Sequence, residues 1–276
     1  MSTDQEKKAF QFRALHRASQ PLVVANAWDA ASARIFEEAE FPAIATTSAG
    51  IAFSQGYPDG ERIPLAHMLE TVARICKVVA VPVTADMESG YGNAPEAVER
   101  TTAGVIEAGA VGINLEDGTR NPEKPLADLP LQLEKLKAVK EASKRAGVSI
   151  VLNARTDAYL RHAGSAREQF EEALRRAKLY RDAGADCIFV PGLSDKTLIS
   201  EIVRELDHPI NILVTDGSPT IAELKGLGVA RVTFGSGPMR ATLKLLQQMA
   251  NEILKEGTYS MLECTVSHAK MNDLMR

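Results

Sequence analysis

The chain contains two matching segments, Val81-Pro82-Val83-Thr84-Ala85-Asp86-Met87-Glu88 and Val111-Gly112-Ile113-Asn114-Leu115-Glu116-Asp117. In each segment an apolar run typical of a buried strand ends in acidic residues. Because the carboxyl ends of neighbouring parallel strands open at the same edge, we expect these carboxylates to lie close together. Hard oxygen ligands placed in this way suit a divalent cation such as Mg2+. The two segments therefore predict a metal site in an α/β protein.

The alternation of strand and helix continues along the whole chain, about eight times. Continuous apolar strands that alternate with amphipathic helices indicate a parallel sheet buried on both faces, and eight units favour a closed (β/α)8 TIM barrel over an open sheet. The predicted strands are Leu22–Asn26, Ala43–Thr47, Val81–Ala85, Val111–Leu115, Ile150–Ala154, Cys187–Val190, Ile210–Val214 and Arg231–Phe234. The predicted helices include Pro64–Val79, Ala94–Ala108, Leu131–Ala146, Ala166–Ala183 and Thr197–Leu206.

Length and composition favour one domain. The chain has 276 residues, 45% of them hydrophobic, and no Pro- or Ser-rich linker divides it, so we expect residues 1–276 to form a single barrel domain. A long helical pattern over Gly237–Glu256 continues towards Arg276, although a barrel needs only one helix there. We expect residues 237–276 to form a C-terminal helical extension exchanged between subunits. Packing across the bottom of the barrel is the alternative.

Charge and hydropathy exclude several classes of partner. The net charge is −4 and the basic residues are dispersed, so neither nucleic acid nor an anionic membrane is an expected partner. No apolar run is long enough to cross a bilayer, and the polar N-terminal segment lacks the apolar core of a signal peptide. We therefore expect a cytoplasmic protein. The three cysteines lie far apart and predict no disulfide framework.

Barrel enzymes place their reactive groups where strands end, so polar residues at those positions are the candidates. Asp86, Glu88 and Glu116 are the predicted metal ligands, and solvated loop acids are the alternative interpretation. Arg155 is the one Arg or Lys at a predicted strand end. Its guanidinium can bind a substrate carboxylate in a bidentate manner. A structural salt bridge to Asp157 or Glu116 is the other reading of this arginine.

Three further features complete the candidate site. The turn Thr47-Ser48-Ala49-Gly50 offers backbone N–H groups that can hold a carboxylate or an enolate oxygen, or it is simply a tight turn of small residues. Trp28 is either a wall of the pocket or a core residue. A lyase that cleaves a malate-type alcohol also needs a general base, for which Glu116 and Asp59 are candidates. Asp59 is equally well explained as an ordinary turn acid.

Several motifs, in this order, resemble the isocitrate lyase and phosphoenolpyruvate mutase superfamily. The resemblance runs from about Pro21 to Arg240 and implies a barrel, usually a homodimer or homotetramer with an exchanged C-terminal helix, that binds Mg2+ or Mn2+ and a 2-oxo acid. It also implies a metal held by acids at Asp86, Glu88 and Glu116, partly through water. The motifs are Asn26-Ala27-Trp28-Asp29-Ala30-Ala31-Ser32-Ala33-Arg34, Thr47-Ser48-Ala49-Gly50, Asp86-Met87-Glu88-Ser89-Gly90-Tyr91-Gly92, Gly112-Ile113-Asn114-Leu115-Glu116-Asp117 and Ala154-Arg155-Thr156-Asp157.

Departures from the family pattern narrow the choice of reaction. The loop that carries a catalytic cysteine in isocitrate and methylisocitrate lyases reads Gly118-Thr119-Arg120-Asn121-Pro122-Glu123-Lys124-Pro125 here, without Cys or His. The phosphonate-processing branch has a cation near the end of the sixth strand, where this chain reads Phe189-Val190-Pro191-Gly192. Its gating loop is represented at most by Asn121, with Arg120 or Lys124 nearby. We expect Asn121 to close over the substrate, and a loop that is simply mobile is the alternative.

The favoured function is therefore a Mg2+-dependent lyase or decarboxylase. It would act on a small 2-oxo or 2-hydroxy acid of the oxaloacetate or malate type, through the metal-stabilised enolate that the resemblance implies. One alternative is cleavage of the C–P bond of phosphonopyruvate, as in a hydrolase or mutase. Another, from a different class, is a catalytically silent barrel that binds 2-oxo acids, since loss of gating-loop residues is what such a protein would display.

Overall fold

Eight parallel strands close into a barrel in the order β1 to β8, which confirms the predicted TIM-barrel class. The computed structural model describes residues 3–161 and 164–276. Each predicted strand is present, with its ends shifted by at most two residues. The strands are β1 Leu22–Ala27, β2 Ile44–Thr46, β3 Val83–Asp86, β4 Gly112–Glu116, β5 Val151–Arg155, β6 Cys187–Phe189, β7 Ile210–Leu213 and β8 Arg231–Thr233.

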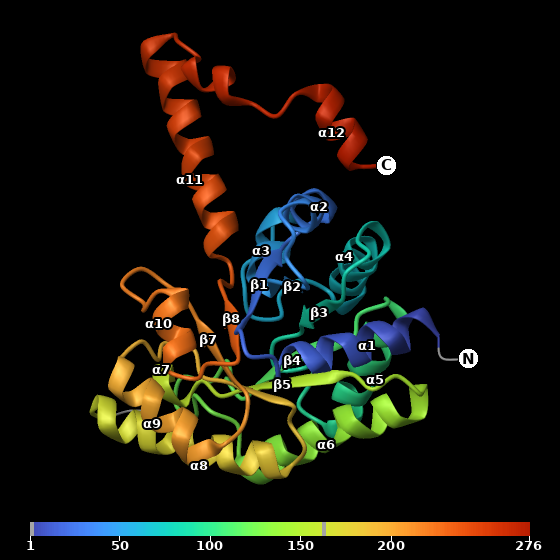
Figure 1. Cartoon of the computed structure of the whole chain (residues 1–276), viewed down its shortest axis with the longest axis vertical. Coiled ribbons are helices and arrows are strands. Elements are labelled where there is room, and N and C mark those ends of the chain that lie inside the picture. Colours follow the sequence, from blue (N-terminus) through green and yellow to red (C-terminus); the bar gives the residue numbers. More distant parts are fainter. Residues whose placement is uncertain (1–2, 162–163) are drawn as a thin grey trace.

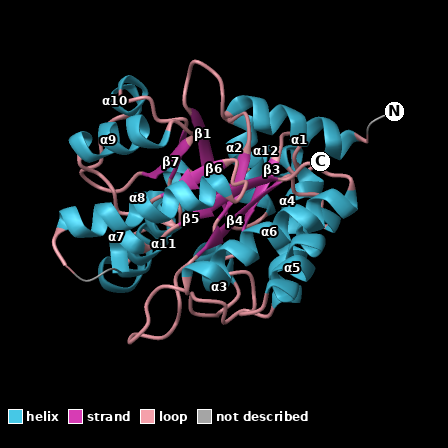
Figure 2. Ribbon diagram, turned by 90° about the horizontal axis from the view of Figure 1, so that it is seen from below, coloured by secondary structure: helices cyan, strands magenta, loops and turns pink. Residues whose placement is uncertain are grey.

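Helices surround the strands (Figures 1 and 2), and those of the barrel bury apolar residues. In α4, for example, Met68, Val72 and Ile75 are buried at helical spacing. None of the helices in the described ranges is long and apolar enough to cross a membrane. The helices are α1 Asp4–Leu15, α2 Ala30–Glu38, α3 Ser48–Ser54, α4 Leu65–Val78, α5 Pro95–Glu107, α6 Leu129–Ala146, α7 Ala158–Arg161, α8 Ala166–Asp182, α9 Lys196–Leu206, α10 Ile221–Gly226, α11 Gly237–Asn251, the π-helix η1 Glu252–Glu256, the 3-10 helix η2 Ser260–Cys264 and α12 His268–Leu274.

Helix α1, which the sequence analysis does not predict, closes the N-terminal end of the barrel. A capping box starts the helix, in which Thr3 and Glu6 bond to each other's backbone N–H. Phe12 is fully buried, and a Cβ on Gly112 of β4 would lie 2.7 Å from its ring. Only glycine at position 112 therefore leaves room for this aromatic plug.

The opposite end of the barrel receives the acidic residues found in the sequence. Asp86 is the last residue of β3 and pairs with Asn114 of β4. Glu116 is the last residue of β4 and pairs with Arg155, the last residue of β5. The register thus carries three predicted site residues to the carboxyl ends of three successive strands.

The C-terminal segment leaves the barrel at the end of β8. Figure 1 shows α11 projecting away from the barrel, with α12 turning back towards α2. Arg34 Nε of α2 donates to the carbonyl of Leu274 at 2.6 Å. The helical pattern predicted over Gly237–Glu256 is present as α11 and η1. Because α1 occupies the barrel bottom, the alternative in which the tail packs there is wrong, while the exchange between subunits stays a prediction.

Candidate active site

Asp86 is anchored by the first residue of α3. Its Oδ2 accepts hydrogen bonds from the backbone N–H of Ser48 at 3.1 Å and from Ser48 Oγ at 2.9 Å. Its other oxygen, Oδ1, is buried without a hydrogen-bond partner in the described part of the chain. One carboxylate oxygen therefore fixes the side chain, and the other is available for a ligand.

The segment Thr47-Ser48-Ala49-Gly50 is the start of a helix, where the sequence analysis expects a turn. Thr47 is the N-cap of α3, and its Oγ1 accepts from Gly50 N at 3.3 Å. Gly50 has no space for a side chain, because an added Cβ would lie 2.5 Å from Thr47 Cγ2 and 3.1 Å from Trp28 Cβ. The small residues thus allow the helix N-terminus to approach the strand ends, where its N–H groups favour negative charge.

Glu88 lies in the loop after β3, in a left-handed backbone conformation with φ of 52°. Its Oε2 accepts from the backbone N–H of Glu61 at 2.6 Å, while Oε1 is buried without a partner among the described residues. Burial, and then the charges of Asp86 and Asp59, raise the pKa of Glu88 to about 8. An apo site would therefore hold a proton on this carboxyl near neutral pH.

Arg155 lies between two carboxylates. Its Nη1 is 2.9 Å from Glu116 Oε2, and its Nε donates to Asp157 Oδ1 at 2.6 Å. Its guanidinium also lies over the ring of Phe189 of β6, 5.6 Å from the centroid. The salt bridges that the sequence left open are therefore formed. Within the described residues these two contacts leave Nη2 as the nitrogen for a substrate. Burial raises the pKa of Glu116 well above its usual range, although Arg155 opposes this.

A buried network around Asp117 holds the loop that carries Asp157. Asp117 Oδ1 accepts from Asp157 N at 2.8 Å, and Oδ2 accepts from Thr156 Oγ1 at 2.8 Å. The same Oδ2 receives the hydroxyl of Tyr180 at 2.6 Å and Nη1 of Arg176 at 3.0 Å, both from α8. Because Asp157 contacts Arg155, this network orients the guanidinium without touching a substrate itself.

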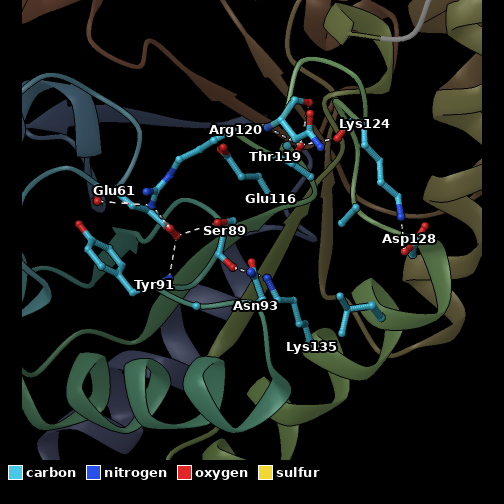
Figure 3. Close-up of a pocket in the computed structure, with 15 residues that line it drawn as sticks. Glu61, Ser89, Tyr91, Asn93, Glu116, Thr119, Arg120, Lys124, Asp128 and Lys135 are labelled. Atoms are coloured by element: carbon cyan, nitrogen blue, oxygen red, sulfur yellow. Dashed lines mark hydrogen bonds and ion pairs between the residues drawn. The ribbon is translucent and has the colours of Figure 1, made fainter.

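A cavity of about 630 Å3 opens beside these residues, under the loop between β4 and α6. Figure 3 shows Arg120 reaching across it to Glu61, which it meets with an Nη2 to Oε2 distance of 2.5 Å. Glu116 and Asn121 are the predicted site residues in its wall. Asn121 Oδ1 accepts from Glu123 N at 3.0 Å, so it stabilises its own loop in this structure.

The remaining two candidates lie at the margins. Asp59 is in an exposed loop, yet its pKa is raised, first by partial desolvation and then by the charge of Asp86, so it lies within electrostatic reach of the acids. Trp28 is half-buried and lines a separate cavity of about 510 Å3 between α2, α3 and α4. The structure therefore brings Asp59 towards the acidic group but turns Trp28 towards a different hollow.

Two residues of this site were not identified from the sequence. Glu61 Oε1 accepts from Ser89 Oγ and Tyr91 N, both at 2.7 Å, and so fixes the loop that carries Glu88. Lys135 of α6 is almost fully buried and donates to the carbonyl of Ser89 at 2.9 Å. Glu61 follows the Asp59-Gly60 pair and could have been suspected, whereas Lys135 resembles any other helical lysine in sequence.

The acids can be tested for their fit to a divalent cation. No three His, Cys, Asp or Glu side chains within residues 3–161 and 164–276 are grouped tightly enough to form a ready-made metal site. However, Asp86 Oδ1 and Glu88 Oε1 are buried and unpartnered there, and the pKa values of Glu88, Glu116 and Asp59 are all raised. Repelling carboxylates with free oxygens fit a cation bound partly through water, which Mg2+ readily accepts.

Comparisons with known proteins agree on one family. The family model described as phosphoenolpyruvate phosphomutase matches residues 12–254. An uncharacterized protein of Mycobacterium tuberculosis is 37% identical over 84% of each chain. Oxaloacetate decarboxylase of Ectopseudomonas mendocina is 33% identical over 84% of this chain and 80% of its own. 2-Methylisocitrate lyase of Bacillus subtilis is 27% identical over 93% of this chain and 85% of its own.

Solved structures give the same result. A putative lyase/mutase from Burkholderia cenocepacia superposes with a TM-score of 0.91 at 34% identity, over 99% of this chain and 96% of its own. Oxaloacetate acetylhydrolase in complex with the product oxalate superposes with a TM-score of 0.86 at 25% identity, over 97% and 93% of the two chains. These neighbours share the whole barrel with this chain.

Proposed function

The chain belongs to the phosphoenolpyruvate phosphomutase family, a family of lyases and mutases, and from this premise we propose a specific reaction class. The protein is a divalent-metal-dependent lyase or decarboxylase for a small 2-oxo or 2-hydroxy carboxylic acid of the oxaloacetate or malate type. Mg2+ is the proposed cation. Relatives named for oxaloacetate decarboxylation and for oxaloacetate acetylhydrolysis support this choice of substrate class.

One observation carries the proposal. Unpartnered carboxylate oxygens of Asp86 and Glu88 lie at the same end of the barrel as the Arg155 guanidinium. Carboxylates held close together attract a cation, and a guanidinium fork attracts a carboxylate. The arrangement therefore suits a ligand that presents a 2-oxo or 2-hydroxy oxygen to the metal and a carboxylate to the arginine.

The candidate residues have separate proposed roles in binding the cation, binding the substrate and moving a proton. Asp86, Glu88 and Glu116 would hold the cation, which when bound supplies Lewis-acid polarisation of the 2-oxo oxygen. Arg155 and the N-terminus of α3 would bind the C1 carboxylate. With oxaloacetate, the bond between C3 and C4 breaks, CO2 leaves, and the electron pair becomes the enolate of pyruvate. A proton then returns to C3, and Glu116 and Asp59 are the proposed groups to move it.

The charges of the loop over the cavity bear on which group the substrate can carry at its distal end. Arg120 and Lys124 are both committed to carboxylates, Glu61 and Asp128 respectively. The end of β6 carries Phe189 and an uncharged sequence. A dianionic phosphonyl group would find little free positive charge there, so C–P chemistry is the second candidate, supported by the family model's own name.

Turnover of oxaloacetate and of phosphonopyruvate, measured side by side at fixed Mg2+, tests the proposal. We expect pyruvate from oxaloacetate, loss of activity with EDTA, and recovery with Mg2+ or Mn2+. The variant Asp86→Asn should lose turnover, whereas Asp128→Asn, at the far side of the cavity, should retain it. Faster turnover of phosphonopyruvate would support the second candidate. Tight binding of 2-oxo acids without any turnover would identify a binding protein and refute the proposed reaction.

A further inference from the structure

A buried guanidinium lies inside the barrel, at the end opposite to the candidate active site. Arg231 is the first residue of β8, and its side chain is fully inaccessible to solvent. In the register it lies beside Asn211 of β7. Thr233, two residues further along β8, bonds through Oγ1 to Asn211 Oδ1, so this face of β8 points to the barrel axis. The guanidinium lies 5.8 Å from the centroid of the Phe12 ring, which plugs the barrel.

The charge on Arg231 has no counter-charge in contact with it. Within the described residues, Nε, Nη1 and Nη2 all lack a hydrogen-bond partner. Burial lowers its pKa to about 10, and the carboxylate that opposes this, Asp86, acts from the far end of the barrel. By contrast, the buried Arg176 is bonded to Asp117, Glu172 and Tyr180. An uncompensated buried cation of this kind is costly unless a negative partner is bound.

The unpartnered polar groups of the barrel interior include both donors and acceptors, and they carry no negative charge. Asn211 Nδ2 and Thr84 Oγ1 are buried and unpartnered in the described chain, as are the acceptors Asn153 Oδ1 and His16 Nε2. His16 donates through Nδ1 to the carbonyl of Phe12 at 2.8 Å, and burial and Arg231 lower its pKa to about 4. Burial raises the pKa of the Cys187 thiol to about 12. Both residues are therefore neutral near pH 7.

We propose that the barrel interior contains a binding site for a small inorganic monoanion of the halide class. Arg231 is its cationic ligand, and Asn211 Nδ2 and Thr84 Oγ1 are further donors. A halide is a spherical acceptor that N–H and O–H groups can approach from several directions, and its charge neutralises the guanidinium. Water would satisfy the donors but leave the charge in place.

The position of the site decides how it fills. Phe12 and α1 cover the N-terminal end, and the interior residues Arg231, Asn211 and Asn153 are inaccessible to solvent. The anion is therefore enclosed as the barrel forms, and it exchanges only when the barrel opens. A probe ion has to be present during folding.

Bromide is the probe for the first experiment. The full-length protein is unfolded in urea, refolded in sodium bromide, crystallised, and examined for anomalous scattering at the bromine edge. We expect an anomalous peak within contact distance of the Arg231 guanidinium. Electron density for water alone at that position, with no anomalous signal, would refute the proposal. The wild-type protein suffices for this result.

Thermal unfolding supplies the second experiment. Wild-type protein refolded in chloride or bromide should unfold a few degrees higher than protein refolded in gluconate, an anion too large for the site, at equal ionic strength. Arg231→Met should lose this difference. The control is Arg13→Met. Arg13 lies at the same end of the barrel, but its guanidinium is outside the barrel interior and is paired with Asp186. A halide effect that persists in Arg231→Met, or disappears in Arg13→Met, would overturn the proposal.

Discussion

Arg155 is the residue on which substrate binding depends most in our proposal. Replacement by Lys keeps the positive charge but removes the planar fork that spans Glu116, Asp157 and a substrate carboxylate. Loss of a charge-assisted hydrogen bond costs about 1.5–3 kcal/mol, so we expect Arg155→Lys to raise KM roughly 10- to 100-fold. Steady-state kinetics with oxaloacetate measures the change.

Arg161→Lys is the matched control for that variant. Arg161 donates to the other oxygen of the same carboxylate, Asp157 Oδ2, at 2.8 Å, and it lies closer to solvent. We expect little change in KM. Equal effects of the two substitutions would mean that Arg155 acts only by holding Asp157, as in the structural interpretation of its salt bridges.

Glu88 gives the apo protein a distinctive dependence on pH. Its pKa is about 8 in the folded chain and near 4.3 in an unfolded one, so the folded state holds a proton that the unfolded state releases. This stabilisation is complete below the unfolded pKa and is lost as the pH rises through 8. We therefore expect the stability of the wild type, relative to Glu88→Gln, to fall between about pH 5 and pH 9.

Urea unfolding in EDTA at several pH values measures this difference. Glu96→Gln, an exposed acid in the first turn of α5, is the control and should follow the wild-type curve. Adding Mg2+ should restore wild-type stability at high pH, because the cation replaces the proton on the acids. Parallel curves for the wild type and Glu88→Gln would show that Glu88 ionises normally.

At the scale of elements, α8 is joined to the loop after β5, which carries Asp157, through one buried carboxylate, that of Asp117. In Asp117→Asn the negative charge that faces Arg176 is removed, leaving Glu172 as the remaining acid partner of that arginine. We expect the free energy of unfolding to fall by about 3 kcal/mol. Tyr180→Phe removes one hydrogen bond to Asp117 and should cost about 1–2 kcal/mol.

Urea titrations of the two variants give these values, and KM for the substrate provides a second readout. If the network orients Arg155 through Asp157, Asp117→Asn should also raise KM, since the loop after β5 loses its anchor. A variant that unfolds earlier but binds substrate normally would limit Asp117 to a purely structural role.

Strands and their order were predictable because their physical signal is local. Each of the eight strands is a short apolar run between helices, and a strand buried on both faces needs nothing else. The positions of Asp86 and Glu116 at strand ends were predictable for the same reason, since each residue ends such a run. Helix α1 was missed because its buried positions, Ala9 and Phe12, are sparse among charged residues.

Contacts between distant residues were beyond the reach of the sequence. Glu61 and Lys135 act on the loop of Ser89 from other elements, and nothing in their own segments indicates a partner. The same holds for Arg231, which reads as the start of a strand and whose burial becomes evident only when the barrel closes. The helical start of α3 was read as a turn because small residues fit both structures.

At the scale of the whole molecule, the unusual feature is an apolar surface on the projecting C-terminal segment. Leu243, Leu246, Ile253 and Leu254 are between 39% and 85% exposed. At helical spacing they lie on one side of α11 and η1, and leaving such a face in water is unfavourable. We expect a second copy of the chain to cover it, which accords with the subunit exchange that the family resemblance implies.

Light scattering on purified protein tests this expectation. We expect the wild type to be a dimer or tetramer and the double variant Leu243→Glu and Leu246→Glu, which places two charges in the apolar face, to be a monomer. Gln248→Glu with Asn251→Asp adds the same charge on the polar side of α11 and should leave the mass unchanged, because those side chains face water in either state. Charges buried without partners in an interface prevent association. A double leucine variant that keeps the wild-type mass would therefore contradict this interface. A monomeric wild type would contradict it as well.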